Sequence, residues 1–315
     1  MVKSLNDGGT GKIYFESFNP YSYNHILEQR DNDKKTVVFG VLNIPESSEP
    51  QIGAIIYVHG SSGVLTKHER WLKAFNDMGV ATFRLDSFKT RGVSSTVGSQ
   101  LEVTSAMMTA DAYNALKLLS THPRIDKERI GIMGSSKGGA VTLVSAWEPI
   151  RRAMVDGKLK FAFHIALYPF CYGLESVQMT GAPILTLMGE KDDWTPAAPC
   201  VELTNSIKNA GYDANIILYP NAYHDFDSDT DPYYLENALN MTKCRAVIQS
   251  NGLAIEKTSG LRMDQPDQLE KVWETCATRG VNLGKNSNAK EKSMKEVKKF
   301  IATVFKLDAP INNLK

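Results

Sequence analysis

Short apolar runs rich in β-branched and aromatic residues alternate along the chain with stretches of helical period. The apolar runs predict strands at residues 36–42, 54–58, 80–85, 129–133, 161–168, 184–188 and 214–219. The stretches between them predict helices, and the clearest lie at residues 71–78, 105–120 and 197–209. Because strands and helices alternate, the sequence predicts an α/β protein with a mainly parallel central sheet and helices on both faces.

The pattern changes after residue 226. Residues 225–231 are polar, and residues 249–284 are irregular, with too little apolar periodicity to form a core of their own. A lysine-rich helix with one apolar face is predicted at residues 289–304. We therefore expect a single domain over residues 1–315, with its core at about 36–226 and a C-terminal excursion plus final helix at 227–315.

Composition excludes several classes of function. The chain has 36 basic and 35 acidic residues, so its net charge of +1 leaves no electrostatic footprint for nucleic acid. No apolar run approaches the ~18 residues that a membrane span requires, so no membrane insertion is expected. The four cysteines have no C-x-x-C pairing, which argues against a zinc site, and we expect no metal or cofactor. An enzyme or a binder of small molecules remains.

The strongest chemical signal is the G-x-S-x-G pentapeptide at residues 134–138. It directly follows a predicted strand and opens a predicted helix, which is the setting of a nucleophile elbow. The glycines allow a sharp turn that exposes the hydroxyl of Ser136 at the carboxyl edge of the sheet, beside helix N–H groups that stabilise negative charge. Ser136 is therefore the predicted nucleophile.

A serine nucleophile needs a neighbouring base, and His224 fits this role best among the six histidines. It follows the last predicted core strand, and loops at the carboxyl ends of strands are where α/β sheets place catalytic groups. The acid that orients the imidazole is expected in the loop after the preceding strand. Asp192 is the first choice there, Asp193 the second and Glu190 the third. The order Ser136, Asp192, His224 is the chain order of α/β-hydrolase triads.

A glycine-rich segment after the strand at 54–58, His59-Gly60-Ser61-Ser62-Gly63, predicts an oxyanion hole. The backbone N–H groups of Ser61 and Lys137 are the expected donors. His59 is expected to hold this loop in place rather than to act as a second base.

Four segments together resemble the dienelactone hydrolase family: His59-Gly60, GSSKGG at 134–139, GEKD at 189–192 and YPNAYHDF at 219–226. The resemblance implies the α/β-hydrolase fold, and its G-x-x-D spacing favours Asp192 as the acid. The type enzyme uses a cysteine nucleophile, whereas this chain has Ser136. We therefore expect a serine hydrolase acting on small or medium carboxylic esters or lactones rather than on dienelactone itself.

Loops that follow the strands are expected to form a partly apolar substrate pocket from Phe88, Arg91, Phe170, Tyr172 and Trp194. The segment at residues 86–92 also resembles a loop that borders the pocket in the family.

The C-terminal segment resembles the ends of exported family members, which implies a disulfide between Cys244 and Cys276. Cys171 and Cys200 are expected to be free thiols. The N-terminus has no apolar leader region. We therefore expect a cytoplasmic protein if Met1 is the native start, and a periplasmic or secreted one if a leader was removed.

Two other functions remain open: a peptidase or amidase on the same fold, and a non-catalytic binder. Peptidases of this fold usually carry a large additional domain, and only about 35 residues precede the first predicted strand. A non-catalytic binder would be expected to lack part of the triad, and all three residues are present.

Overall fold

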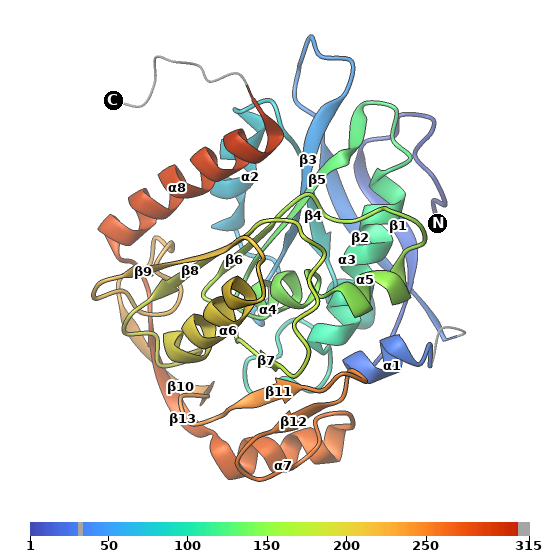
Figure 1. Ribbon diagram of the computed structural model, residues 1–315. Coiled ribbons are helices and arrows are strands. Elements are labelled where there is room, and N and C mark those ends of the chain that lie inside the picture. The colour runs from blue at the N-terminus through green and yellow to red at the C-terminus, as the bar shows by residue number, and fades with distance from the viewer. Residues whose placement is uncertain (31–33, 308–315) are drawn as a thin grey trace.

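A computed structural model describes residues 1–30 and 34–307. They form a fold around one eight-stranded central sheet (Figure 1). Its strands are β1 (Gly11–Phe18), β2 (Lys35–Asn43), β3 (Ile52–Val58), β4 (Ala81–Asp86), β5 (Ile125–Ser135), β6 (His164–Leu167), β8 (Ile184–Gly189) and β9 (Ala214–Tyr219). Their spatial order is β1-β2-β4-β3-β5-β6-β8-β9. All neighbouring pairs from β4 to β9 are parallel, whereas β1–β2 and β2–β4 are antiparallel. The predicted, mainly parallel sheet is confirmed.

The apolar content of each strand matches its place in the sheet. All seven residues of β3 are buried because it lies between β4 and β5 under helices on both faces. The strand β1, in contrast, alternates buried and exposed side chains, as a half-exposed edge strand does. The strand β1 was not predicted, and the expectation of a sheet edge at residues 36–42 was wrong, because β1 lies outside β2. The alternation of Lys12, Ile13, Tyr14, Phe15 and Glu16 is itself a strand signal that could have identified β1.

Helices cover the sheet in two groups (Figure 1). They are α2 (His68–Asn76), α3 (Ser105–Leu119), α4 (Lys137–Val144), α5 (Glu148–Met154), α6 (Ala197–Asn209) and α8 (Ser287–Phe305), with a short α1 (Tyr23–Leu27) near the N-terminus. α3 packs against α4 and α5, whereas α2 packs against α8. The apolar face of α8 is buried as predicted, with Val297 and Ile301 fully inaccessible and Phe305 in contact with Phe163 of the sheet.

The C-terminal excursion is more regular than its sequence indicates. It contains β10 (Tyr233–Asn240), β11 (Ala246–Ile248), β12 (Ala254–Glu256), α7 (Pro266–Cys276) and β13 (Thr278–Leu283). β10 pairs with β13, and β11 joins β12 to β7 (Gly173–Leu174), a two-residue strand that follows β6. Strands of three residues are too short to give an apolar period, so the pattern could not reveal them. In Figure 1 the orange excursion lies below the sheet, beside the segment that follows β6.

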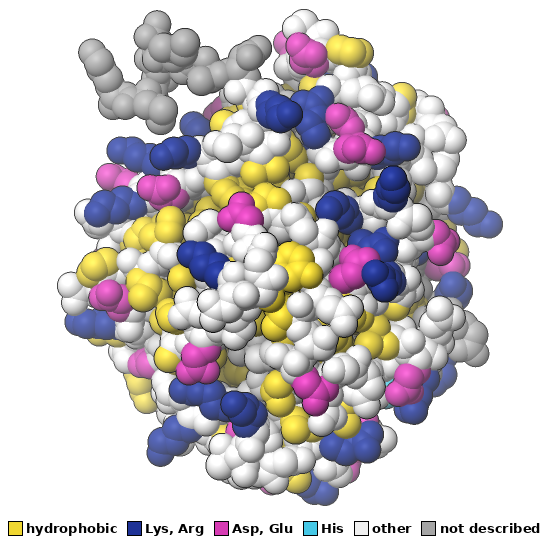
Figure 2. All heavy atoms as spheres, viewed as in Figure 1, with side chains coloured by type: hydrophobic (Ala, Val, Ile, Leu, Met, Phe, Trp, Pro, Cys, Tyr) yellow, Lys and Arg dark blue, Asp and Glu magenta, His cyan; other side chains and the backbone are white. Residues whose placement is uncertain are grey.

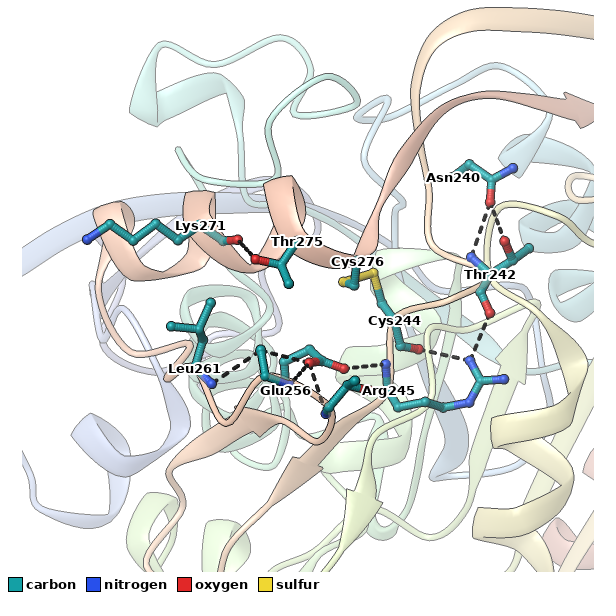
Figure 3. The surroundings of a disulfide bond; sticks show 11 residues. Asn240, Thr242, Cys244, Arg245, Glu256, Leu261, Lys271, Thr275 and Cys276 are labelled. Atoms are coloured by element: carbon teal, nitrogen blue, oxygen red, sulfur yellow. Dashed lines mark hydrogen bonds between the residues drawn. A yellow bond between two sulfur atoms is a disulfide. The ribbon is translucent and has the colours of Figure 1, made fainter.

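Two disulfides tie the excursion and the loops together. Cys244, before β11, bonds to Cys276 at the end of α7, with Cα atoms 5.0 Å apart (Figure 3). Beside this bond the buried carboxylate of Glu256 accepts the backbone N–H groups of Arg245, Thr258 and Ser259.

The second disulfide joins Cys171 to Cys200, with Cα atoms 5.1 Å apart. The expectation of two free thiols there was wrong. α6 packs against the segment that follows β6, and this tertiary contact brings together two cysteines 29 positions apart.

The surface carries charges of both signs. On the face shown in Figure 2, basic and acidic side chains are interspersed rather than gathered into one patch. Within residues 1–30 and 34–307, none of the helices has the length and apolar character needed to cross a lipid bilayer. In the same described part of the chain, no cluster of three His, Cys, Asp or Glu side chains is placed to hold a metal ion. The single-domain organisation stays a prediction.

All four cysteines are paired, so the unfolded, unreduced protein should show no reactive thiol. After reduction the same protein should show four reactive thiols. The Cys244→Ala/Cys276→Ala variant should lose about 3–4 kcal/mol of unfolding free energy, since the bond closes a loop of 32 residues. Thiol titration in denaturant and urea unfolding measure the two quantities. Two reactive thiols before reduction would show that one pair is open.

Candidate active site

The loop between β5 and α4 holds Ser136 in a conformation that is rare for a non-glycine residue, with φ 54° and ψ −117°. Close backbone packing explains the flanking glycines. A Cβ atom at Gly138 would lie 2.1 Å from the carbonyl oxygen of Val58, and one at Gly134 would lie 2.2 Å from the carbonyl oxygen of Gly138. A larger residue at position 138 would push the turn away from β3, and one at position 134 would push β5 and the start of α4 apart. The structure thus has the sharp strand-to-helix turn that the pentapeptide predicted.

Ser136, His224 and Asp192 form a continuous chain of hydrogen bonds. Ser136 Oγ lies 2.9 Å from His224 Nε2, and His224 Nδ1 lies 2.7 Å from Asp192 Oδ2. His224 follows β9 and Asp192 follows β8, so both come from carboxyl ends of neighbouring strands. Both side chains are almost completely buried. The three residues expected to act together are therefore in contact.

The carboxylate of Asp192 is fixed by its own loop. Its Oδ1 atom accepts the backbone N–H groups of Trp194 and Thr195 at 3.0 and 2.9 Å, which leaves Oδ2 directed at His224. These two bonds stabilise the ionised carboxylate that can hold an imidazolium in place.

The two alternative acids lie elsewhere. Asp193 accepts the backbone and side-chain N–H groups of Asn282, at 2.8 and 2.7 Å, and so ties this loop to β13. Glu190 is exposed. Of the three acidic candidates, only Asp192 contacts the histidine.

Sequence reasoning missed Thr195, whose hydroxyl oxygen lies 3.1 Å from His224 Nδ1 and 3.2 Å from Asp192 Oδ2. The same hydroxyl donates to the carbonyl oxygen of Tyr168 at 3.0 Å. Thr195 therefore supports the orientation of the imidazole from the side opposite the serine. Its position three residues after the motif aspartate is a signal that could have identified it.

Tyr168 was also missed, and it connects the histidine to a buried polar cluster. Its ring packs edge-on against His224 with centroids 4.6 Å apart, and its hydroxyl donates to Asp227 at 2.7 Å. Asp227 also accepts the indole N–H of Trp71 in α2. Burial alone would raise the pKa of Asp227, but the nearby Lys67 ammonium and these hydrogen bonds outweigh it and lower that pKa. The cluster is assembled by tertiary contacts, so no short motif encodes it.

The two residues expected to form the oxyanion hole lie on one cavity wall with Ser136. Gly60 packs so closely on the elbow that a Cβ atom there would lie 3.1 Å from the carbonyl oxygen of Ser135. In the turns and loops that the structure describes, the N–H groups of Ser61 and Lys137 have no backbone acceptor. Their role as oxyanion donors stays a prediction.

His59 lies behind this loop and does not reach the serine. Its Nδ1 atom lies 2.8 Å from the carbonyl oxygen of Gly60, and its Nε2 atom accepts the N–H of Ser87 at 3.2 Å. Burial is the largest influence on its pKa and lowers it, so the ring is neutral and binds the loop as expected.

Two of the five residues expected in the pocket do not line it. Phe88 is buried against the ring of His59, with centroids 4.5 Å apart. Arg91 forms a buried ion pair with Asp111 of α3, at 2.7 Å. The prediction was wrong for both because a position after a strand does not reveal which way the side chain packs.

The other three expected residues, Phe170, Tyr172 and Trp194, line a cavity of about 70 Å³ beside Ser136. Part of the remaining wall comes from segments near the two ends of the chain. The N-terminal segment contributes Tyr21 and Tyr23, and the excursion contributes Met241, Met263, Leu269 and Trp273. Sequence reasoning missed this part of the wall because it comes from elements far apart in the chain.

The side chain of Lys137 is buried beneath the cavity and holds a loop. Its ammonium group donates to Thr96 Oγ1 at 2.8 Å and to the carbonyl oxygen of Val103 at 2.7 Å. Burial lowers the pKa of Lys137 to about 7, although the carboxylate of Glu102 opposes this shift. Lys137 therefore links the elbow to residues 96–103.

Comparison with known proteins places this geometry in a family. A model of the dienelactone hydrolase family matches residues 39–249, which include the elbow, Asp192 and His224. The chain belongs to the dienelactone hydrolase family. A relative from a Bradyrhizobium species, named "Probable 2-oxo-3-(5-oxofuran-2-ylidene)propanoate lactonase", is 30% identical over 118 residues, which cover 37% of this chain and 47% of the relative. The chain spans less than half the length of the curated relatives that it matches.

Solved structures share the fold of this dienelactone hydrolase family member. Esterase 2 of Thermogutta terrifontis, phosphoramylated by tabun, has a TM-score of 0.57 at 15% identity and covers 87% of this chain and 92% of its own. The same esterase phosphorylated by paraoxon has a TM-score of 0.56 at 15% identity, with the same coverage of both chains. The architecture is the α/β-hydrolase fold, as the sequence predicted.

Asp192→Asn and Asp193→Asn form a matched pair of variants. Asp192→Asn should lower kcat on p-nitrophenyl butyrate by about 10⁴-fold because the amide no longer fixes the imidazole tautomer. Asp193→Asn loses contacts to Asn282 only, so kcat should stay within about threefold while unfolding free energy falls by about 1 kcal/mol. A larger kcat loss in Asp193→Asn would exchange the two roles.

Lys137 should make stability depend on pH. Its folded pKa is about 7, while its ordinary value is 10.5, so between these values the unfolded chain binds a proton that the folded chain has released. The unfolding free energy should therefore rise from about pH 7 to pH 10 relative to Lys137→Met, and lie lowest below pH 7. Urea unfolding of both proteins at pH 6, 7, 8 and 9 measures this difference. If the unfolding free energies of the two proteins changed with pH in parallel, the Lys137 ammonium group would not be desolvated in the folded state.

Proposed function

We propose that the chain is a carboxylic-ester hydrolase acting on small or medium esters or lactones, with Ser136, His224 and Asp192 as its catalytic triad. The observation that carries this proposal is the hydrogen-bond chain from Ser136 Oγ through His224 to Asp192, at 2.9 and 2.7 Å, beside a cavity. A serine hydroxyl alone is a weak nucleophile, and this arrangement supplies the base and the group that orients it.

In the acylation step, Ser136 Oγ attacks the ester carbonyl carbon while its proton moves to His224 Nε2. The carbonyl π electrons move onto the oxygen, and the N–H groups of Ser61 and Lys137 stabilise this oxyanion. When the oxyanion collapses, the bond to the alcohol oxygen breaks, and His224 gives its proton to that oxygen. Asp192 stays ionised and stabilises the imidazolium.

In the deacylation step, a water molecule replaces the alcohol. His224 takes a proton from the water as its oxygen attacks the acyl carbon, and the same N–H groups stabilise the second oxyanion. Collapse breaks the bond to Ser136 Oγ, which regains its proton from His224. The products are a carboxylic acid and the free enzyme.

The size of the site favours small substrates. The cavity beside Ser136 has a volume of only about 70 Å³, which favours a small acyl group over a long one. Family membership and the lactonase name of one relative support esters and lactones as the substrate class. Two disulfides in one chain also favour a working environment that is oxidising.

Ser136→Ala and His224→Ala should each lower kcat on p-nitrophenyl butyrate by about 10⁴-fold or more, because each removes a member of the triad. Ser206→Ala, at an exposed position of α6, is the matched control and should retain parent activity. Steady-state kinetics of the purified proteins measures the effect. Activity of Ser136→Ala within tenfold of the parent would refute the proposal.

A further inference from the structure

Two cavities of similar size flank Ser136, and they differ in chemistry. The first, of about 70 Å³, is the one described above, and we call it the apolar arm because Phe170, Tyr172 and Trp273 are among its walls. The second, of about 80 Å³, is lined by Lys67, Asp225 and His224, and we call it the polar arm. Ser61, Ser136 and Trp194 border both arms, so the nucleophile lies at their junction.

We propose that the polar arm binds the alcohol part of the ester and the apolar arm binds the acyl part, which would make the preferred substrates esters of short apolar acids with polyhydroxylated alcohols. This inference rests on the proposed function and specifies its substrate class. It assigns a specificity-determining role to Lys67 and Asp225 on one side of Ser136 and to Trp273 on the other.

The chemistry of the triad determines which substituent enters which arm. The leaving oxygen must lie near His224 Nε2, because that atom gives it a proton. His224 lines the polar arm, whereas Lys137, an expected oxyanion donor, lines the apolar arm. With the oxyanion directed at Ser61 and Lys137 and the leaving oxygen at His224, the acyl chain is left with the apolar arm.

The walls of the apolar arm suit a short acyl chain without charge. Ala106 of α3 and Ala140 of α4 leave space near Ser136, and Trp273 of α7 lies on the wall that the excursion contributes. The one cationic side chain among the described lining residues is Lys137, and its ammonium group is hydrogen-bonded to Thr96 and Val103. A carboxylate on the acyl chain would therefore lose its hydration without gaining a counter-ion.

The walls of the polar arm suit an alcohol that carries further hydroxyl groups. Lys67 forms an ion pair with Asp225, and both side chains are largely buried, at 14% and 16% exposure. An ammonium group donates hydrogen bonds and a carboxylate accepts them, so the pair can bind both the oxygen and the proton of a hydroxyl. A purely apolar alcohol would cover this buried ion pair without replacing the hydrogen bonds of its water.

The two half-reactions separate the arms experimentally. Acylation involves both parts of the ester, but the alcohol has left before deacylation begins. A change in the polar arm should therefore affect acylation alone, whereas a change in the apolar arm should affect both steps. The substrates are p-nitrophenyl butyrate, p-nitrophenyl decanoate and glyceryl monobutyrate. Rapid mixing with p-nitrophenyl butyrate gives a burst whose rate reports acylation and whose steady state reports deacylation.

Lys67→Met should lower kcat/KM for glyceryl monobutyrate about tenfold relative to p-nitrophenyl butyrate, with an unchanged deacylation rate of the butyryl enzyme. Lys67→Arg should keep most of the preference for the glyceryl ester, since it keeps the charge. Lys73→Met, at an exposed lysine of α2, is the matched control and should change neither quantity. An equal loss on both butyrate esters, or slower deacylation, would overturn the role of Lys67 in binding the alcohol.

Trp273→Ala should raise the ratio of kcat/KM for decanoate over butyrate about tenfold, because a longer acyl chain gains space, and it should alter the deacylation rate. The preference between glyceryl and p-nitrophenyl butyrate should stay within twofold of the parent. If the preference between the two butyrate esters changed while the ratio of decanoate to butyrate did not, the assignment of the two arms would be reversed. Failure of the proposed function would look different: the parent would hydrolyse none of the three esters, or Ser136→Ala would retain activity.

Discussion

Close packing between the nucleophile elbow and the end of β3 is the constraint on which the site depends. The backbone of Gly138 approaches the carbonyl oxygen of Val58 so closely that no side chain fits between them. This contact fixes where α4 begins, and Ser136 is consequently held at a positive φ of 54°. The same contact brings the loop with Ser61 against the turn, so that the proposed nucleophile and the proposed oxyanion donors are positioned by one packing arrangement. The strain at Ser136 persists because the buried sheet on either side stabilises it.

The position of His224, the proposed base, depends on a second, longer-range set of contacts. His224 is held by Asp192 and Thr195 from the loop after β8, and by Tyr168 from the loop after β6. The hydroxyl of Tyr168 in turn bonds to Asp227, which also accepts from Trp71 in α2. Every side chain in this hydrogen-bonded series is buried and has a hydrogen-bond partner. Moving the imidazole would therefore leave several polar groups unpaired. The orientation of His224 is therefore set by two loops at strand ends and, through Asp227, by α2.

How much the sequence predicts depends on how local the determining interactions are. The parallel strands and the contact of Ser136, Asp192 and His224 followed from apolar runs and from short motifs at strand ends, because those features are determined by neighbouring residues. The strand β1 was missed although its alternating apolar and polar residues are a local strand signal, whereas its place at the edge of the sheet is defined only by the fold. Arg91 was misassigned because its partner, Asp111, lies on another element. The Cys171–Cys200 bond depends on how α6 packs, and the position of Trp273 in the cavity wall depends on how the excursion packs. No local sequence pattern predicts either arrangement.

The central claim is that His224 activates Ser136 to form a covalent intermediate. Treatment with paraoxon, followed by intact mass measurement and peptide mapping, tests it most directly because the phosphorylated serine does not turn over quickly. The account predicts one diethylphosphoryl group per chain, located on Ser136, with formation slowed by at least about 10²-fold in His224→Ala. A parent protein that stays unmodified, or that carries the group on another residue, would contradict the account.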